Sequence, residues 1–238
     1  MSCQVKEYYN RYHTNKPASI YFNIKGEKTS SPHYRHILDL MRVEKAKIIS
    51  DIGCGSGELL TEAKKRGLIC HGVDISEEAL KAAKSKTEAY YICADIELGL
   101  FYPNEYFDYV TCLGVWEHFK NQESVLREMV RILKKTGKMC IFVPNKNYIL
   151  HKLGYETDYQ PVINRYSLDE YIEKLEKAGV FIDKILKNNF HLSNLNESFG
   201  YIKHFIKLLI HPFLIFLPLR LSYHFIFICS KQSYYSNR

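Results

Sequence analysis

Short apolar runs alternate with amphipathic stretches through the middle of this 238-residue chain. Runs rich in β-branched and aromatic residues predict strands at 46–53, 68–76, 88–96, 107–114 and 137–145. Between them, apolar positions recur at helical spacing over 57–67, 77–86 and 121–137. Strands that alternate with helices of this length predict an α/β fold with a parallel sheet covered on both faces.

The second part of the chain is less regular. After an irregular stretch at 146–166, a helix is predicted over 167–179, where Ser167 and Glu170 have the spacing of a capping box. Two further strands are predicted at 180–190 and 223–232. The length suits one domain, and no internal repeat interrupts it.

The segment at 192–222 is unusually apolar. Its charge-free core, LLIHPFLIFLPL, has 12 residues and two prolines, whereas a helix that spans a bilayer needs about 20 apolar residues. Two interpretations stay open. The segment is either a helical cap packed over the sheet or, through 199–222, a face that touches the inner side of a membrane or a lipid-like substrate. In the second case Lys203, Lys207 and Arg220 would lie near the headgroups.

Charge and cysteine content narrow the functional classes. The formal net charge of +7 is spread along the chain without a lysine-rich or arginine-rich block, so no nucleic-acid partner is expected. The seven cysteines include no C-x-x-C pair, so no metal site is predicted. The first residues are polar and carry charges early, unlike a secretory signal, and we expect a cytoplasmic protein with reduced thiols.

The stretch SDIGCGSGELL (50–60) carries the first chemical signal. A strand that enters a glycine turn and then a helix places a ligand against backbone amides. No Gly-Lys-Ser or Gly-Lys-Thr follows, as a phosphate-binding P-loop requires. A G-x-G-x-x-G dinucleotide motif would need glycine at Glu58 or Leu60. Because Glu58 would also repel a pyrophosphate, the loop predicts a ligand without phosphates.

Three aspartates follow predicted strands beside this loop. Asp74 lies 19 residues after Gly55, where a carboxylate accepts hydrogen bonds from ribose hydroxyls. Asp95 ends the next strand and could face an exocyclic amine of a purine, and Asp51 could orient the glycine turn or meet a cationic group. Carboxylates at successive strand ends suit a positively charged ligand such as a sulfonium or an ammonium.

Several runs taken together resemble one known family. IISDIGCGSGELL, GVDIS, CADI, FDYVTCLGVWEHF and LREMVRILKKTGKMCIFVPN, in this order, are similar to the class I S-adenosylmethionine-dependent methyltransferases over about 46–190. VWEHF and VPN resemble the small-molecule group of that family, which includes quinone-biosynthesis and sugar methyltransferases. The resemblance implies a Rossmann-like α/β fold with a seven-stranded sheet, mostly parallel with an antiparallel last strand at 223–232. It also implies S-adenosyl-L-methionine as the cofactor.

The resemblance further implies a role for each matching residue. Asp51, Gly53, Gly55 and Gly57 would hold the methionine part of the cofactor, and Leu113 with Gly114 would line the same side. Asp74 would bind the ribose, Ile75 would pack on the adenine, and Asp95 with the Ile96 backbone would bind its amine. Trp116, Glu117 and His118 would lie at the mouth of the active site.

These inferences combine into one functional hypothesis. The chain is predicted to be a single methyltransferase domain over 1–238, with a helical cap at 1–45 and a cofactor-binding core at 46–145. An acceptor-side insert is predicted at 146–166 and an apolar helical insert at 192–222. The aromatic-rich segment 7–22 is predicted to close over the cofactor.

The predicted reaction is methyl transfer to oxygen of a small-molecule acceptor, either a glycan intermediate or a lipid-like aromatic. His118 is the candidate general base, because imidazole titrates near physiological pH. Alternatively, His118 and Glu117 only tie the loop after the fourth strand to its helix. Nucleic-acid methylation is not expected, because the chain has neither [DN]-P-P-[YF] after the fourth strand nor a Pro-Cys pair. A non-catalytic S-adenosylmethionine-binding regulatory or assembly module stays open as an alternative.

Overall fold

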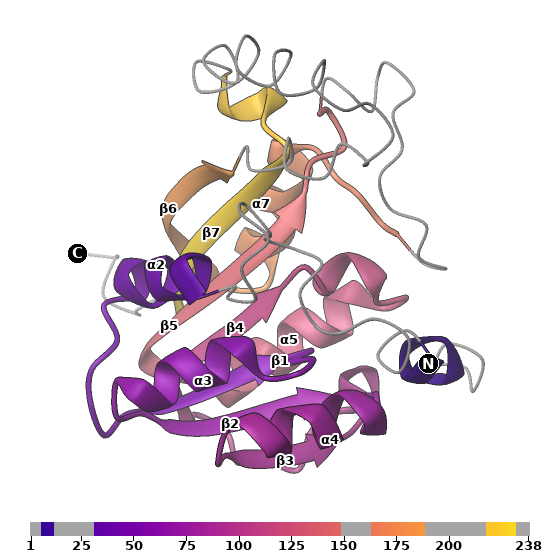
Figure 1. The fold of residues 1–238 in the computed structure, drawn as a ribbon. Helices are drawn as coiled ribbons and strands as arrows, with labels where there is room; N and C mark the ends of the chain where they lie inside the picture. The colour runs from indigo at the N-terminus through magenta and orange to yellow at the C-terminus, as the bar shows by residue number, and fades with distance from the viewer. Residues whose placement is uncertain (1–5, 12–30, 149–162, 189–217, 232–238) are drawn as a thin grey trace, which may run out of the picture.

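A computed structural model describes residues 6–11, 31–148, 163–188 and 218–231 of the chain (Figure 1). Seven strands form one sheet in the order β3-β2-β1-β4-β5-β7-β6. Their bounds are β1 Ile48–Ile52, β2 Ile69–Asp74, β3 Tyr90–Cys93, β4 Phe107–Leu113, β5 Leu133–Pro144, β6 Val180–Asn188 and β7 His224–Lys231. All seven strands predicted from the sequence are present.

Strand directions follow the pattern that the sequence resemblance implies. β1 is parallel to β2 and β4, β2 is parallel to β3, and β4 is parallel to β5. Only β7 is reversed, and it pairs antiparallel with both β5 and β6. The fold prediction is therefore confirmed. Because the chain order reverses between β1 and β4, a crevice is expected beyond the carboxyl ends of these two strands.

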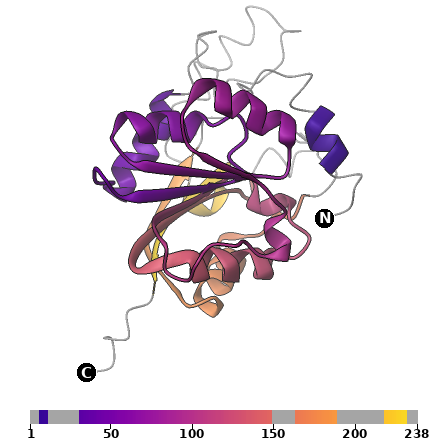
Figure 2. The same cartoon turned by 90° about the horizontal axis from the view of Figure 1, so that it is seen from below.

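Helices cover both faces of the sheet, which Figure 2 shows edge-on. α2 (Ser31–Met41), α3 (Glu58–Lys65) and α4 (Glu77–Lys86) pack over one face, and α5 (Gln122–Ile132) and α7 (Leu168–Lys177) pack over the other. The side chains of β5 are buried on both faces of the sheet. Cys140 and Phe142 belong to the buried cluster on the α2 side, whereas Met139 and Ile141 belong to the cluster on the α5 side. Successive strand residues point to opposite faces, and here both faces are apolar.

One predicted boundary is wrong. The helix expected over 121–137 ends at Ile132, and β5 begins at Leu133. Leu133 pairs with Phe107 at the start of β4, and Lys134 forms an ion pair with Asp108 at 2.9 Å. Pairing with β4 therefore overrides the helical pattern of these residues. By contrast, the predicted capping box is confirmed, because the Ser167 amide donates to the Glu170 carboxylate and the Glu170 amide donates to the Ser167 hydroxyl.

The predicted division into cap, core and inserts stays a prediction. Residues 6–11 and α2 are helical within 1–45, but most of 146–166 and of 192–222 lies outside the described residues. Arg220, one of the three cations considered for membrane contact, forms an ion pair with Asp169 of α7. Within the described ranges, no helix is long and apolar enough to cross a membrane.

Candidate active site

The glycine loop joins β1 to α3 in a backbone conformation that requires glycine. Gly53 has a φ of 69°, in the left-handed region. A Cβ added to Gly53 would lie 2.6 Å from both γ carbons of Val115, which follows β4. The amides of Gly53 and Cys54 both donate to the carbonyl of Val73 in β2, at 2.7 and 3.0 Å. The loop is thus fixed against both strands that flank β1.

Asp74 connects the glycine loop to the start of α4. One oxygen of its carboxylate accepts a hydrogen bond from the Gly55 amide at 2.8 Å, and the other accepts one from the Ser76 amide at 2.8 Å. The residue is nearly buried, with 9% of its surface exposed. These two hydrogen bonds fix the Asp74 carboxylate between the glycine loop and the start of α4, and its predicted role in binding the ribose stays a prediction.

Asp51 is the most perturbed acid of the loop. Burial raises its pKa to about 7, the Thr111 hydroxyl opposes this by donating a hydrogen bond at 2.6 Å, and the charges of Asp74 and Glu58 raise it further. Glu58 itself accepts hydrogen bonds from the Ser56 hydroxyl and the Lys86 ammonium, each at 2.7 Å. A cation held near Asp51 would favour its ionised form.

The residues predicted to contact the adenine lie at the ends of β2 and β3. Asp95 caps the 3₁₀ helix η1 (Ile96–Leu98) by accepting a hydrogen bond from the Glu97 amide at 3.0 Å. The Ile96 side chain packs in the buried cluster on the α5 side, and its carbonyl accepts a hydrogen bond from the Gly99 amide at 3.0 Å. Ile75 is half-buried, and its carbonyl accepts a hydrogen bond from the Cys93 thiol at 3.5 Å.

The loop after β4 corrects one prediction. Trp116, in the 3₁₀ helix η2 (Trp116–His118), is fully buried in the core and does not lie at the mouth of a site. Its indole NH donates to the backbone carbonyl of Gln122 at 3.0 Å, and its own carbonyl accepts from the side-chain amide of Gln122 at 2.9 Å. An aromatic side chain with its polar atom satisfied packs well against the Tyr171 ring, whose centroid lies 5.7 Å away.

His118 is also buried, with 3% of its surface exposed. Its Nε2 lies 3.8 Å from the Glu117 carboxylate, and its ring lies 6.3 Å from that of Tyr9, between centroids. The Asn164 amide donates to the Glu117 carbonyl at 2.8 Å. The role of His118 as a base and its role as a loop anchor are both compatible with these contacts, and both stay predictions.

Sequence reasoning missed an aromatic cluster at the carboxyl end of β5. The Gly114 amide donates to the Phe142 carbonyl at 2.8 Å, so Phe142 adjoins the end of β4 near the half-buried Leu113. The His224 ring stacks on Phe142 at 4.5 Å, and the His33 ring meets it at 5.5 Å. Burial lowers the pKa of His33 to about 4, with His36 adding to the shift. His33 and His224 are too far apart in sequence for a local signal to have joined them.

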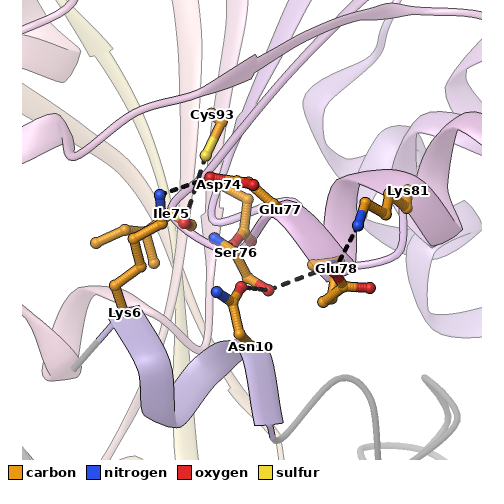
Figure 3. Close-up of polar contacts among 10 residues, drawn as sticks. Lys6, Asn10, Asp74, Ile75, Ser76, Glu77, Glu78, Lys81 and Cys93 are labelled. Carbon is orange, nitrogen blue, oxygen red and sulfur yellow. Dashed lines mark hydrogen bonds and ion pairs between the residues drawn. The ribbon is translucent and has the colours of Figure 1, made fainter. Parts of the chain in front are cut away.

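A short helix over 6–11 lies against the start of α4 (Figure 3). The Ser76 hydroxyl donates to the side-chain carbonyl of Asn10, and the Lys6 ammonium contacts the Glu77 carboxylate, each at 2.8 Å. The predicted closure of 7–22 over the cofactor falls partly outside the described residues, since 12–30 are not among them.

The sheet order, the reversed β7 and the glycine loop between β1 and α3 are those of the class I S-adenosylmethionine-dependent methyltransferases. Comparison with known proteins agrees, because the methyltransferase domain family matches residues 50–141. The chain is also 30% identical over 172 residues to the ubiquinone biosynthesis O-methyltransferase of Coxiella burnetii, covering 63% of this chain and 73% of that protein. The chain therefore belongs to this methyltransferase family, and S-adenosyl-L-methionine is its methyl donor.

Solved structures show the same fold. Phosphoethanolamine N-methyltransferase 2 of Haemonchus contortus in complex with S-adenosyl-L-methionine superimposes with a TM-score of 0.61 at 19% identity, covering 84% of this chain and 52% of that one. The [4+2]-cyclase SpnF superimposes with a TM-score of 0.66 at 15% identity, covering 96% and 93%. Since a cyclase shares the fold, the fold by itself does not define the reaction.

The described residues fit the cofactor. Gly53 lets Val115 pack directly against the glycine loop, and a neighbouring cation would favour the ionised form of the Asp51 carboxyl. Asp74 offers acceptors at the end of β2. Within the described part of the chain, no group of three histidine, cysteine or acidic side chains is placed to hold a metal ion. The individual roles assigned to the cofactor-binding residues stay predictions.

Proposed function

We propose that this methyltransferase methylates a hydroxyl oxygen of a small aromatic acceptor. The observation that carries the proposal is the stack of His224 on Phe142 beside Gly114, at the end of β4. Both rings are nearly buried, with 2% of Phe142 and 7% of His224 exposed, and they stack on each other. They therefore form an apolar aromatic wall beside Gly114, and ligand sites lined in this way favour an apolar ring over a sugar. The printed name of the Coxiella burnetii relative, a ubiquinone biosynthesis O-methyltransferase, supports the same acceptor class. Of the two acceptor classes that the sequence leaves open, this favours the aromatic one over the glycan.

Alignment is the main task of this chain's residues. When bound, the cofactor supplies an electrophilic methyl group on a sulfonium and leaves as a neutral thioether. Holding the acceptor oxygen in line with that methyl group contributes about 7–11 kcal/mol to rate acceleration. The glycine loop follows β1 and Phe142 lies near the end of β5, with β4 between these strands, so the two are suited to hold the reactants on either side of the end of β4.

A hydroxyl acceptor must also lose its proton, and we infer that His118 takes it. General-base catalysis contributes about 10²–10⁴-fold. His33, whose pKa is about 4, is neutral at pH 7 and holds a proton weakly. That property suits His33 to orient an acceptor hydroxyl and leaves His118 as the stronger candidate for the base.

The test is a methylation assay with cofactor labelled on the methyl group, in which a dihydroxybenzoate is compared with a simple methyl glucoside. Label transfer to the phenolic oxygen is expected, and Phe142→Leu should raise the acceptor KM while leaving the cofactor Kd unchanged. Transfer to the sugar alone would overturn the aromatic assignment. Cofactor binding without turnover on a broad pool of acceptors would favour the non-catalytic module.

The base assignment has its own test. His118→Ala and His118→Gln should each lower kcat about 10²-fold or more and remove the acidic limb of its pH profile. His36→Gln is the matched control, because His36 is an exposed histidine of α2. Wild-type turnover in both His118 variants would leave His118 as a loop anchor.

A further inference from the structure

We propose that the helix over 6–11 is a working part of the active site, in which Asn10 positions the cofactor-binding carboxylate and Tyr9 positions His118. The proposal rests on the cofactor site and, for Tyr9, on the proposed role of His118. Both residues act through others, so they are positioning residues. Docking of this helix would then link cofactor retention to the geometry of the base.

The first contact is on the adenosine side. Ser76 is fully buried, and its hydroxyl accepts a hydrogen bond from the Ala79 amide at 3.2 Å while donating one to Asn10. The Ser76 amide donates to Asp74, whose other oxygen holds the glycine loop. Asn10 is therefore connected through one residue to the carboxylate predicted to bind the ribose.

The second contact is on the side of the reacting groups. His118 follows β4, whereas Ser76 follows β2, and β1 lies between these strands in the sheet. Neighbouring strands are about 4.8 Å apart, so the two contacts are separated by about 10 Å. Tyr9 and Asn10 are adjacent in the helix, so this distance is bridged by the Tyr9 side chain, whose ring centroid lies 6.3 Å from that of His118, and not by the length of the helix. Figure 1 draws the helix beyond the arrowheads of β1 and β2.

Adjacent side chains on a helix point about 100° apart, which lets Tyr9 and Asn10 face different partners. The Tyr9 ring lies 6.3 Å from the ring of His118 at 58° and packs edge-on against Tyr8 at 5.3 Å. Lys6 adds the ion pair with Glu77 at the opposite end of the helix. The three described contacts that leave the helix thus reach Ser76 and Glu77 at the start of α4 and His118 in the loop after β4.

A helix of six residues depends on its contacts with the rest of the molecule. A helix this short does not form stably by itself, and an exposed ion pair such as Lys6–Glu77 contributes little. Docking of the helix over 6–11 must therefore be favoured by its contacts with Ser76 and His118. By linkage, a cofactor that stabilises the docked helix is itself held more tightly by that helix.

The experiment measures cofactor release from the full chain in the absence of acceptor. Asn10→Ala should raise the dissociation rate of S-adenosylhomocysteine about five-fold, the effect expected for one neutral hydrogen bond. Arg11→Ala is the matched control, because Arg11 is exposed and its ion pair is with Glu7 of the same helix. Equal release rates for wild type, Asn10→Ala and Arg11→Ala would overturn the role of Asn10.

Tyr9→Leu tests the other half of the proposal. It should lower kcat several-fold and shift the acidic limb of the pH profile, with the acceptor KM unchanged, whereas Tyr9→Phe should retain both. A variant that only loosened the fold would change KM and kcat without moving the pH profile. An unshifted profile in Tyr9→Leu would remove Tyr9 from the site.

Hydrogen exchange in the wild-type protein provides a readout that needs no variant. Amides of 6–11 should exchange more slowly when S-adenosylhomocysteine is bound, and unchanged exchange would contradict the linkage. Because release and exchange are measured without an acceptor, they can succeed even if no aromatic substrate is found. A failure of the proposed O-methylation is thus distinguishable from a failure of the helix.

Discussion

The hydroxyl of Thr111 in β4 donates a hydrogen bond to the carboxylate of Asp51 in β1, with 2.6 Å between the two oxygens. Thr111 is fully buried and Asp51 nearly so. This bond opposes the burial that raises the pKa of Asp51 to about 7. Asp51 therefore lies at the boundary between its neutral and ionised forms under physiological conditions, directly before the glycine loop.

The first prediction concerns cofactor affinity. A sulfonium or ammonium near Asp51 favours the carboxylate, so binding of the cofactor should release a proton from Asp51 and become tighter as pH rises through about 7. Asp51→Asn should bind more weakly and lose most of this dependence. Thr111→Val should shift the midpoint to higher pH, because the hydrogen bond that lowers the pKa is gone. Calorimetric titrations from pH 5.5 to 8.5 check this, and a Kd independent of pH would contradict it.

The second prediction concerns stability without cofactor. For Asp51, the folded pKa of about 7 exceeds the ordinary value of 3.8, so the folded state holds the proton longer. The contribution of Asp51 to the free energy of unfolding is therefore largest below about pH 4 and is lost as pH rises toward 7. For His33 the folded pKa of about 4 lies below the ordinary 6.5, so its contribution is present above pH 6.5 and is lost as pH falls toward 4.

The two residues therefore give opposite slopes in overlapping pH windows. Relative to wild type, Asp51→Asn should gain stability as pH rises from 4 to 7, and His33→Asn should gain stability as pH falls from 6.5 to 4. Thermal unfolding across pH 4–8 measures both differences. Parallel curves for the wild type and either variant would rule out that residue as a source of the pH dependence.

The third prediction separates two costs at the glycine loop. Gly53→Ala places a methyl group 2.6 Å from Val115 and also forces alanine into the left-handed region. Gly99→Ala is a control for strain without a clash, since Gly99 has a φ of 86° and a ψ of 160°, a region almost restricted to glycine, with nothing within 4 Å of its added Cβ. Gly99→Ala should cost about 1–3 kcal/mol of unfolding free energy with normal cofactor affinity.

Gly53→Ala should cost more than Gly99→Ala and should weaken cofactor binding at least ten-fold. Adding Val115→Ala to Gly53→Ala should recover the part of the loss that comes from the clash. Chemical denaturation and calorimetric titration measure the two quantities. If Gly53→Ala and Gly99→Ala behaved alike in both assays, close approach at Gly53 would not matter.

The fourth prediction concerns Trp116, which was expected at the mouth of the site and lies in the core instead. Trp116→Phe keeps an aromatic ring but removes the donor to the Gln122 carbonyl. The variant should lose about 1–3 kcal/mol of unfolding free energy, because a buried acceptor is left without its partner. Cofactor Kd and acceptor KM should stay as in wild type, and a change in either of them without a loss of stability would return Trp116 to the site.

The burial of Trp116 is a feature that local sequence patterns could not predict. Alternation of strands and helices, the glycine loop and the acidic strand ends are local signals, and they led to the sheet, its layers and the cofactor. Burial of Trp116 depends on Tyr171, which is distant in sequence, and the early start of β5 depends on pairing between Leu133 and Phe107. The cluster of His33, Phe142 and His224 likewise comes from three separate elements. Contacts of this kind arise only once the sheet has brought distant segments together.

The last prediction concerns Asn145, directly after β5. Its side-chain amide donates to the carbonyls of Arg220 and Ser222, at 3.0 and 2.7 Å, and its side-chain oxygen accepts from the Asn147 amide at 2.9 Å. The residue is fully buried and joins the end of β5 to the segment that enters β7, from which His224 stacks on Phe142.

Asn145→Ala leaves two carbonyls without their donor and should cost about 2–4 kcal/mol of unfolding free energy. It should raise the acceptor KM several-fold and leave the cofactor Kd unchanged, because the glycine loop lies on other strands. Asn104→Ala is the control, since Asn104 is an exposed asparagine that accepts a bond from Arg131. An Asn145→Ala protein that lost stability but kept the wild-type KM would show that Asn145 supports the fold without shaping the acceptor side.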